Sequence, residues 1–154
     1  SLEVIAWATI GGGILLQLAD QLAPRRKTAD GWLLRDALAM GLAQALALIP
    51  GMSRSGVTIT AARALGYDRV DAAKLSMLMS IPTIIAAGTL LSLKLVSDGD
   101  AALGADAAVA AVLSFIAALV AIAVFMRMLR TWSMTVFTVY RLALGAALLF
   151  VVYA

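Results

Sequence analysis

The sequence predicts an all-α polytopic membrane protein that has transmembrane helices and one re-entrant helix hairpin. Three observations lead to this fold class. Hydrophobic residues make up 63% of the chain and charged residues only 14%, whereas about a quarter of the residues of a soluble domain are charged. Several apolar segments have the length of about 20 residues that a bilayer crossing needs. One further apolar segment is too short to cross and ends at Pro50-Gly51.

The composition excludes several function classes. The net charge is +3, from 12 basic and 9 acidic residues, which is too low and too scattered for a nucleic-acid-binding surface. The absence of cysteine excludes disulfides and thiol chemistry, and the absence of histidine removes the usual neutral-pH base and the commonest metal ligand. The chain starts at Ser1 and shows no signal peptide, so we expect one integral membrane unit that is a piece of a longer protein.

Four segments are predicted to cross the membrane. They lie at about residues 2–22, 72–96, 105–129 and 136–153. Gly11-Gly12-Gly13 either weakens the first helix or allows another helix to approach it closely. Pro82 is expected to kink the second span.

A helix hairpin is predicted at about residues 37–66. The apolar stretch from Ala37 to Ile49 suits a half-spanning helix better than a full crossing, and Pro50-Gly51 then breaks it. A second short helix is expected from about Ser55 to Leu65, with Gly66 as its C-cap.

The charges predict that this hairpin returns to the side from which it enters. Basic residues flank it on both sides and also follow the fourth apolar segment: Arg25, Arg26, Lys27, Arg35, Arg69, Lys74, Arg127 and Arg130. The loop between the two central spans is acidic and carries Asp98, Asp100 and Asp106. The positive-inside rule places that loop outside and both ends of the hairpin inside, which is consistent only with a re-entrant hairpin.

Residues 49–60, IPGMSRSGVTIT, form the candidate functional site. An arginine at the bilayer centre costs at least about 2.5 to 3.5 kcal/mol, so such residues usually face a cavity, a partner or a substrate path. The second short helix should present the unpaired N–H groups of Gly56, Val57 and Thr58 at the positive end of its dipole. Helix N-termini of this kind bind anions.

The side chains around this helix start suit a phosphate group. The glycines allow close approach of a ligand, the hydroxyls donate hydrogen bonds and the guanidinium matches phosphate oxygens. The candidate residues are Arg54 and Ser53 for catalysis, and Ser55, Gly56, Thr58, Gly51 and Gln44 for phosphate binding. Gln44 either lines the same cavity or bonds across helices.

A purely structural interpretation is open for each of these residues. Ser53 or Ser55 can serve only as a helix cap, and Arg54 can snorkel or pair with a carboxylate of another segment. Threonine in a membrane helix often bonds a backbone carbonyl three or four residues earlier, which applies to Thr58 and Thr60.

At these residues the chain resembles a known family. Residues 41–60, followed by Leu65-Gly66 and by residues 72–82, are similar to the second signature region of undecaprenyl-diphosphate phosphatases of the bacitracin-resistance type. The similarity extends along the whole chain, including residues 138–141, but it matches only the C-terminal part of such an enzyme. In that family, two inverted-topology halves each contribute a re-entrant hairpin, so the resemblance implies that this chain is one half of an inverted-repeat fold.

The resemblance also implies a function. The reaction is hydrolysis of a polyprenyl diphosphate to the monophosphate and inorganic phosphate, which recycles the lipid carrier of cell-wall synthesis at the bacterial cytoplasmic (inner) membrane. The family's roles pass to Ser53, Arg54, Ser55 and Thr58, with Arg54 as the phosphate clamp and Ser53 as the local nucleophile candidate. A divalent cation, Mg²⁺ or Ca²⁺, is expected in the full enzyme, with ligands outside this chain.

The implied partners are the polyprenyl diphosphate, bilayer lipids and an N-terminal half, and a homodimer is left open.

Two other function classes compete with the phosphatase. Broken helices that direct their dipoles at an anion are also typical of transporters, so half of a transporter or channel for an anionic substrate is the alternative. In a third class, a structural subunit, Arg54 would be replaceable by Lys or Gln without loss of activity.

Overall fold

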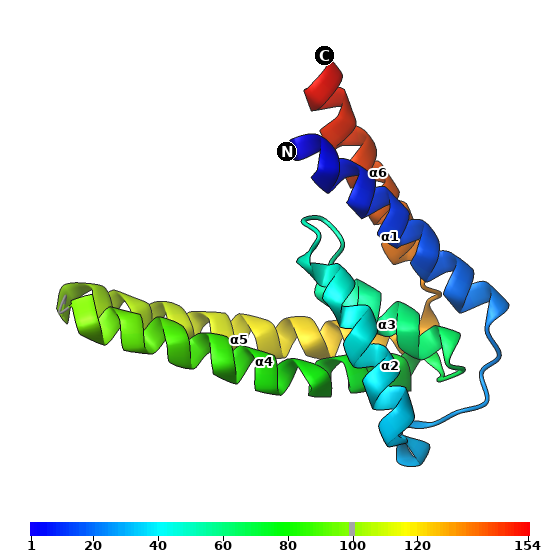
Figure 1. The fold of residues 1–154 in the computed structure, drawn as a ribbon, viewed down its shortest axis with the longest axis horizontal. Helices are drawn as coiled ribbons and strands as arrows, with labels where there is room; N and C mark the ends of the chain where they lie inside the picture. The colour runs from blue at the N-terminus through cyan, green and yellow to red at the C-terminus, as the bar shows by residue number, and fades with distance from the viewer. Residues whose placement is uncertain (99–100) are drawn as a thin grey trace. The chain divides into compact units, whose positions relative to one another are not determined.

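The chain is described by a computed structural model, which covers residues 1–98 and 101–154 (Figure 1). The described residues form six α-helices: α1 (Leu2–Leu22), α2 (Leu34–Gln44), α3 (Arg54–Ala64), α4 (Arg69–Asp98), α5 (Ala101–Thr131) and α6 (Thr135–Tyr153). Two short 3₁₀ helices, η1 (Ala29–Gly31) and η2 (Ala45–Leu48), flank α2. The all-helical prediction is therefore confirmed.

Four helical stretches among the described residues are long and apolar enough to cross a membrane. They are Leu2–Leu22, Arg69–Lys94, Asp106–Thr131 and Thr135–Tyr153, with a mean hydropathy between 1.6 and 2.8. Four apolar helical stretches of this length agree with a polytopic membrane protein.

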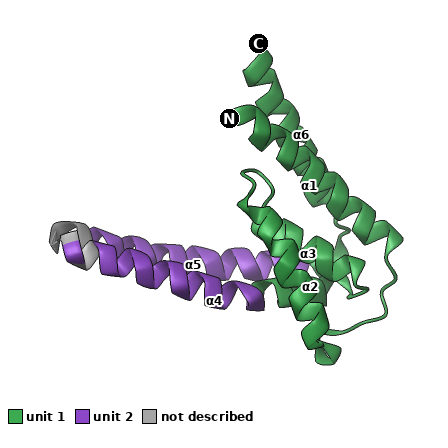
Figure 2. Ribbon diagram, viewed as in Figure 1, with its two compact units in different colours: residues 1–77, 129–154 green, residues 78–128 purple. Residues whose placement is uncertain are grey.

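The chain divides into two compact units, which are described separately (Figure 2). Unit 2 comprises residues 78–128, of which the described residues belong to α4 and α5. Helix α4 continues through Pro82. The expected loop from Val96 to Asp106 is largely helical, because α4 extends to Asp98 and α5 starts at Ala101. Asp100 lies outside the described residues.

Unit 1 comprises residues 1–77 and 129–154 and contains the candidate site. Within it, α1 and α6 pack side by side in antiparallel orientation (Figure 1). The Gln17 amide donates to Thr135 Oγ1 at 3.0 Å near one end of the pair, and the Tyr153 hydroxyl donates to Glu3 Oε1 at 2.5 Å near the other. A Cβ at Gly145 would collide with the Ile10 side chain, so the glycine allows the close contact between the two helices.

The hairpin consists of α2, η2 and α3, and α3 packs on both α2 and α1. Its second helix ends in a Schellman motif. Gly66 has a φ of +95°, its N–H donates to Arg63 O at 2.9 Å, and the Tyr67 N–H donates to Ala62 O at 3.1 Å. This geometry explains why a glycine marks the end of the helix, because the left-handed φ favours a residue without a side chain.

Two clusters of charged and polar groups hold the open end of the hairpin, where α2 begins and α3 ends. In the first, Arg63 and Asp20 are both buried, and Arg63 Nε donates to Asp20 Oδ1 at 3.0 Å. Arg69 at the start of α4 donates to the same carboxylate at 2.6 Å. This cluster fixes the end of α3 and the start of α4 to α1.

The second cluster comprises Lys27, Asp36 and Tyr67. The buried Tyr67 hydroxyl donates to Asp36 Oδ2 at 2.7 Å, and Lys27 Nζ lies 2.9 Å from the same oxygen. The hydrogen bond from Tyr67 and that from Lys27 lower the pKa of the Asp36 carboxyl below its usual value. Burial and the bond to Asp36 raise the pKa of Tyr67 to about 12. The start of α2 and Tyr67, the third residue after α3, are thereby held together.

Candidate functional site

The tip of the hairpin is the loop between η2 and α3, and its backbone conformation is unusual at two positions. Gly51 has a φ of +96°, and a Cβ there would collide with the Ile5 carbonyl of α1. Ser53 has φ 60° and ψ 112°, a left-handed conformation that residues other than glycine rarely adopt. Strain of this kind is common at functional sites, where the surrounding structure maintains it.

Ser53 is the N-cap of α3. Its hydroxyl accepts a hydrogen bond from the Gly56 N–H at 3.3 Å, and its carbonyl accepts one from the Val57 N–H at 3.0 Å. The prediction that the N–H groups of Gly56 and Val57 are open to an anion is therefore wrong. The helix begins at Arg54, one residue earlier than expected. The N–H of Ser55 therefore lies in the first turn, where backbone donors have no acceptor within the helix.

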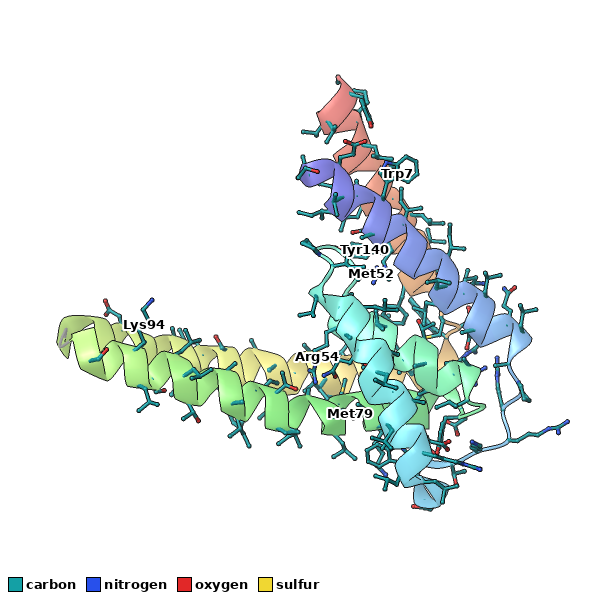
Figure 3. All side chains as sticks on the ribbon, viewed as in Figure 1. Trp7, Met52, Arg54, Met79, Lys94 and Tyr140 are labelled. Carbon is teal, nitrogen blue, oxygen red and sulfur yellow. The ribbon has the colours of Figure 1, made fainter. Side chains whose placement is uncertain are left out.

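Arg54 and Gln44, which lie on the two arms of the hairpin, meet at the tip. Arg54 Nε donates to Gln44 Oε1 at 3.2 Å. Ser53 and Ser55 are exposed on either side of the half-buried Arg54, and Figure 3 labels Arg54 and Met52 among the side chains. The structure thus brings together four of the predicted residues, and the Gln44 amide orients the guanidinium that would bind an anion.

Thr58 lies apart from this group. Its side chain is buried, and Oγ1 lies 3.1 Å from Arg54 O and 2.5 Å from Ser76 Oγ. Thr60 donates to Gly56 O at 2.7 Å. Both hydroxyls therefore bond carbonyls of their own helix, which is the structural alternative that the sequence left open.

One arginine near the tip was not among the predicted site residues. Arg141 of α6 is buried, and Nη2 donates to Met52 O at 3.1 Å. Its position in the apolar segment 136–153 could have identified it from the sequence, because an arginine inside a membrane span is by default a candidate for a functional residue.

The described residues do not fit a divalent cation. No group of three or more acidic side chains lies together in the described ranges, whereas Mg²⁺ and Ca²⁺ prefer several oxygen ligands. Asp20 and Asp36 are bonded to cationic side chains. Ser53 also has no carboxylate partner within the described part of the chain. The described residues around Ser53 therefore include no general base.

The chain is similar to known proteins along nearly its whole length. Residues 1–147 match the family described as bacitracin resistance protein BacA. The whole chain is 52% identical to a protein of Roseobacter denitrificans and 55% identical to one of Dinoroseobacter shibae, each named undecaprenyl-diphosphatase. A protein of the same name from Campylobacter curvus is 47% identical over 96% of this chain.

The chain spans 58% of the length of the first two relatives and 56% of the third. The match nevertheless covers nearly every residue of the chain, including the hairpin tip and Arg141. The chain therefore belongs to the bacitracin resistance protein BacA family.

Proposed function

We propose that this chain is the C-terminal part of an enzyme that hydrolyses undecaprenyl diphosphate to undecaprenyl phosphate and inorganic phosphate, and so recycles the lipid carrier of cell-wall synthesis. The observation that carries this proposal is the tip of the hairpin. A serine-capped helix N-terminus, an arginine oriented by Gln44 and two exposed serines come together in a chain with four candidate membrane spans. The names of the relatives supply the substrate.

We further propose that the hairpin is re-entrant. Its open end is bonded to α1 at Asp20, and its tip is bonded to α1 at Thr9, where Thr9 Oγ1 donates to Gly51 O. At about 1.5 Å per residue, these two points lie about 17 Å apart along the helix axis. The hydrocarbon core is about 30 Å thick, so a hairpin about 17 Å long is too short to cross it. The hairpin therefore enters the membrane, has its tip within the hydrocarbon core and returns to the same side.

The proposed chemistry is phosphoryl transfer. The N-terminus of α3 and the guanidinium of Arg54 bind the terminal phosphate and stabilise the charge on its equatorial oxygens. Water attacks the terminal phosphorus directly, or the Ser53 hydroxyl attacks it and water then hydrolyses the phosphoserine. In both cases the bond to the bridging oxygen breaks, undecaprenyl phosphate leaves, inorganic phosphate is released, and a general base takes up the proton of the attacking group. Ser55 supplies a hydroxyl donor. The spaces beside Gly51 and Gly56 are occupied by the Ile5 carbonyl and by Arg141 Nη1, respectively.

The remaining groups are proposed to come from outside this chain. The general base and the ligands of a Mg²⁺ or Ca²⁺ ion belong to the N-terminal half, because the described residues do not provide them. The complete protein resides in the bacterial cytoplasmic membrane, with bilayer lipids around its apolar helices. The four candidate membrane spans support this location.

Substitution of Arg54 tests the proposal. In the complete polypeptide, Arg54→Lys should lower the rate of phosphate release from undecaprenyl diphosphate by on the order of a few hundredfold, because an ammonium cannot reproduce the bidentate fork. Arg26→Lys is the matched control, since the Arg26 side chain is exposed, and it should keep the wild-type rate.

Two results would contradict the proposal. Near-normal turnover of Arg54→Lys would make Arg54 a structural residue. Uptake of an anion into vesicles without release of phosphate by the wild-type protein would favour the transporter alternative.

A further inference from the structure

Arg141 of α6 lies buried beneath the tip of the hairpin, and its acceptors among the described residues are backbone carbonyls. Its side chain donates from Nε to Thr9 O at 3.1 Å, and from Nη2 to Gly51 O at 3.2 Å and Met52 O at 3.1 Å. It makes no ion pair with any described residue. Burial of a guanidinium without a carboxylate is costly, so these carbonyls are what stabilises it there.

Two glycines of α1 make room for this side chain. A Cβ at Gly12 would collide with Arg141 Nη2 and lie 3.3 Å from Met52 O, and a Cβ at Gly13 would lie 3.1 Å from Arg141 Cβ. A Cβ at Gly11 would meet nothing within 4 Å. The first two glycines therefore form a notch for Arg141, and the third does not contribute to it.

The bonds from Arg141 act on the residues that set the start of α3. Gly51 and Met52 directly precede Ser53, whose left-handed φ directs its hydroxyl to the Gly56 N–H. Arg141 Nη1 also lies beside this helix start, because a Cβ at Gly56 would be 2.8 Å from it. One guanidinium therefore links α1, the tip loop and the first turn of α3.

We propose that Arg141 is a positioning residue for the phosphate site, an inference that rests on the proposed function. Arg141 binds the carbonyls of Gly51 and Met52 and so fixes the backbone that leads into the strained residue Ser53. The backbone at Ser53 in turn sets the direction in which Arg54 and the first N–H groups of α3 point. Arginine suits this role because its rigid fork binds carbonyls of two segments at once. Lysine keeps the charge but loses this geometry.

Kinetics of the complete polypeptide test this role. Arg141→Lys should lower kcat by on the order of a hundredfold, the effect of a displacement of about 1 Å at a catalytic site, with little change in KM. Gly12→Ala leaves Arg141 in the sequence but displaces its guanidinium, so it should lower kcat in the same way. Gly11→Ala is the matched control and should keep the wild-type kcat. Wild-type kcat in Arg141→Lys, or equal values for the two glycine variants, would overturn the proposal.

A second measurement does not depend on activity. The chain has no cysteine, so Met52→Cys introduces a single thiol at the tip, with any cysteine outside residues 1–154 replaced by serine. Labelling of this thiol by a maleimide should become faster when Arg141→Lys or Gly12→Ala is added, and should not change with Gly11→Ala. Equal labelling rates in all backgrounds would overturn the positioning role. A different pair of results would contradict the proposed function and not the positioning role. In that case Arg141→Lys and Gly12→Ala label faster, but the wild-type protein does not hydrolyse the lipid diphosphate.

Discussion

Arg63 Nε lies 3.0 Å from Asp20 Oδ1, and both side chains are almost completely buried. The two residues come from different helices, and Arg69 binds the same carboxylate. Arg63 also donates through its Nη atoms to the carbonyls of Tyr67 and Asp20. Because every charged group in this cluster has a partner, the loss of one carboxylate leaves two cations without compensation.

Asp20→Asn should therefore destabilise the protein strongly. Removal of one partner from a buried ion pair costs about 3 to 5 kcal/mol, which should appear as a large decrease of the melting temperature in detergent. Asp30→Asn is the control, because Asp30 is exposed, and it should melt like the wild type. Equal melting temperatures for the two variants would show that the cluster does not stabilise the hairpin.

Tyr67→Phe should change the pH dependence of stability. The folded-state pKa of Tyr67 is raised to about 12, above the usual value of about 10. Its contribution is therefore present below pH 10 and is lost as the pH rises to about 12. The Phe variant should be less stable at neutral pH by about 1 to 3 kcal/mol, the value of a hydrogen bond to a charged group, and should lack this alkaline loss.

The same substitution should affect acid stability. The hydrogen bond from Tyr67 is the main cause of the low pKa of Asp36, so the contribution of this carboxylate is present above its unfolded pKa of about 4 and is lost as the pH falls through the lower folded value. In Tyr67→Phe the folded pKa of Asp36 lies closer to the unfolded value, so this loss should be smaller and should be complete at a higher pH. Unfolding monitored between pH 2 and 12 tests both effects, with the exposed Tyr140→Phe as control. Identical pH profiles for the two variants would contradict the prediction.

The sequence predicted those features that depend on local signals. The apolar segments predicted the helical class, Pro50-Gly51 predicted the break between the two short helices of the hairpin, and Gly66 predicted the end of α3. The N-cap was ambiguous because Ser53 and Ser55 both suit that position, and the choice depends on the φ of Ser53, which contacts with α1 and α6 maintain. Sequence alone also could not show which two of the three consecutive glycines face Arg141.

Contacts between distant residues were the main features that local patterns could not predict. Asp20 and Arg63 each interrupt an apolar or mixed segment, but nothing in either segment indicates its partner. The same holds for Arg141, whose acceptors are backbone carbonyls and therefore leave no residue-specific signal. The meeting of Gln44 with Arg54 was anticipated only as one of two alternatives.

The proposed topology can be tested by thiol labelling. Single cysteines at Asp30 and Lys74 should be labelled from the cytoplasmic side, and a cysteine at Asp106 from the outside, because basic residues flank the hairpin on both sides. All three side chains are exposed. Labelling of positions 30 and 74 from opposite sides would exclude a re-entrant hairpin and favour a full crossing.

Residues 1–154 alone should insert into membranes but should show no phosphatase activity above background. The three aspartates closest in sequence to the site are engaged at the open end of the hairpin, away from Arg54. Asp36 accepts from Tyr67 and Lys27, Asp71 Oδ2 accepts from the Ala29 N–H at 3.0 Å, and Asp68 Oδ1 accepts from the Asp71 N–H at 2.8 Å. None of them is placed to act as a base for Ser53 or for water beside Arg54.

Purified residues 1–154 would be assayed with undecaprenyl diphosphate and added Mg²⁺ or Ca²⁺, with and without a co-expressed N-terminal half. Activity should require both parts, because the phosphate donors and the acid-base groups lie on different segments. Robust turnover by residues 1–154 alone would contradict a site shared between two halves. The base would then have to come from one of the three aspartates after rearrangement of the hairpin, or from a second copy of the chain.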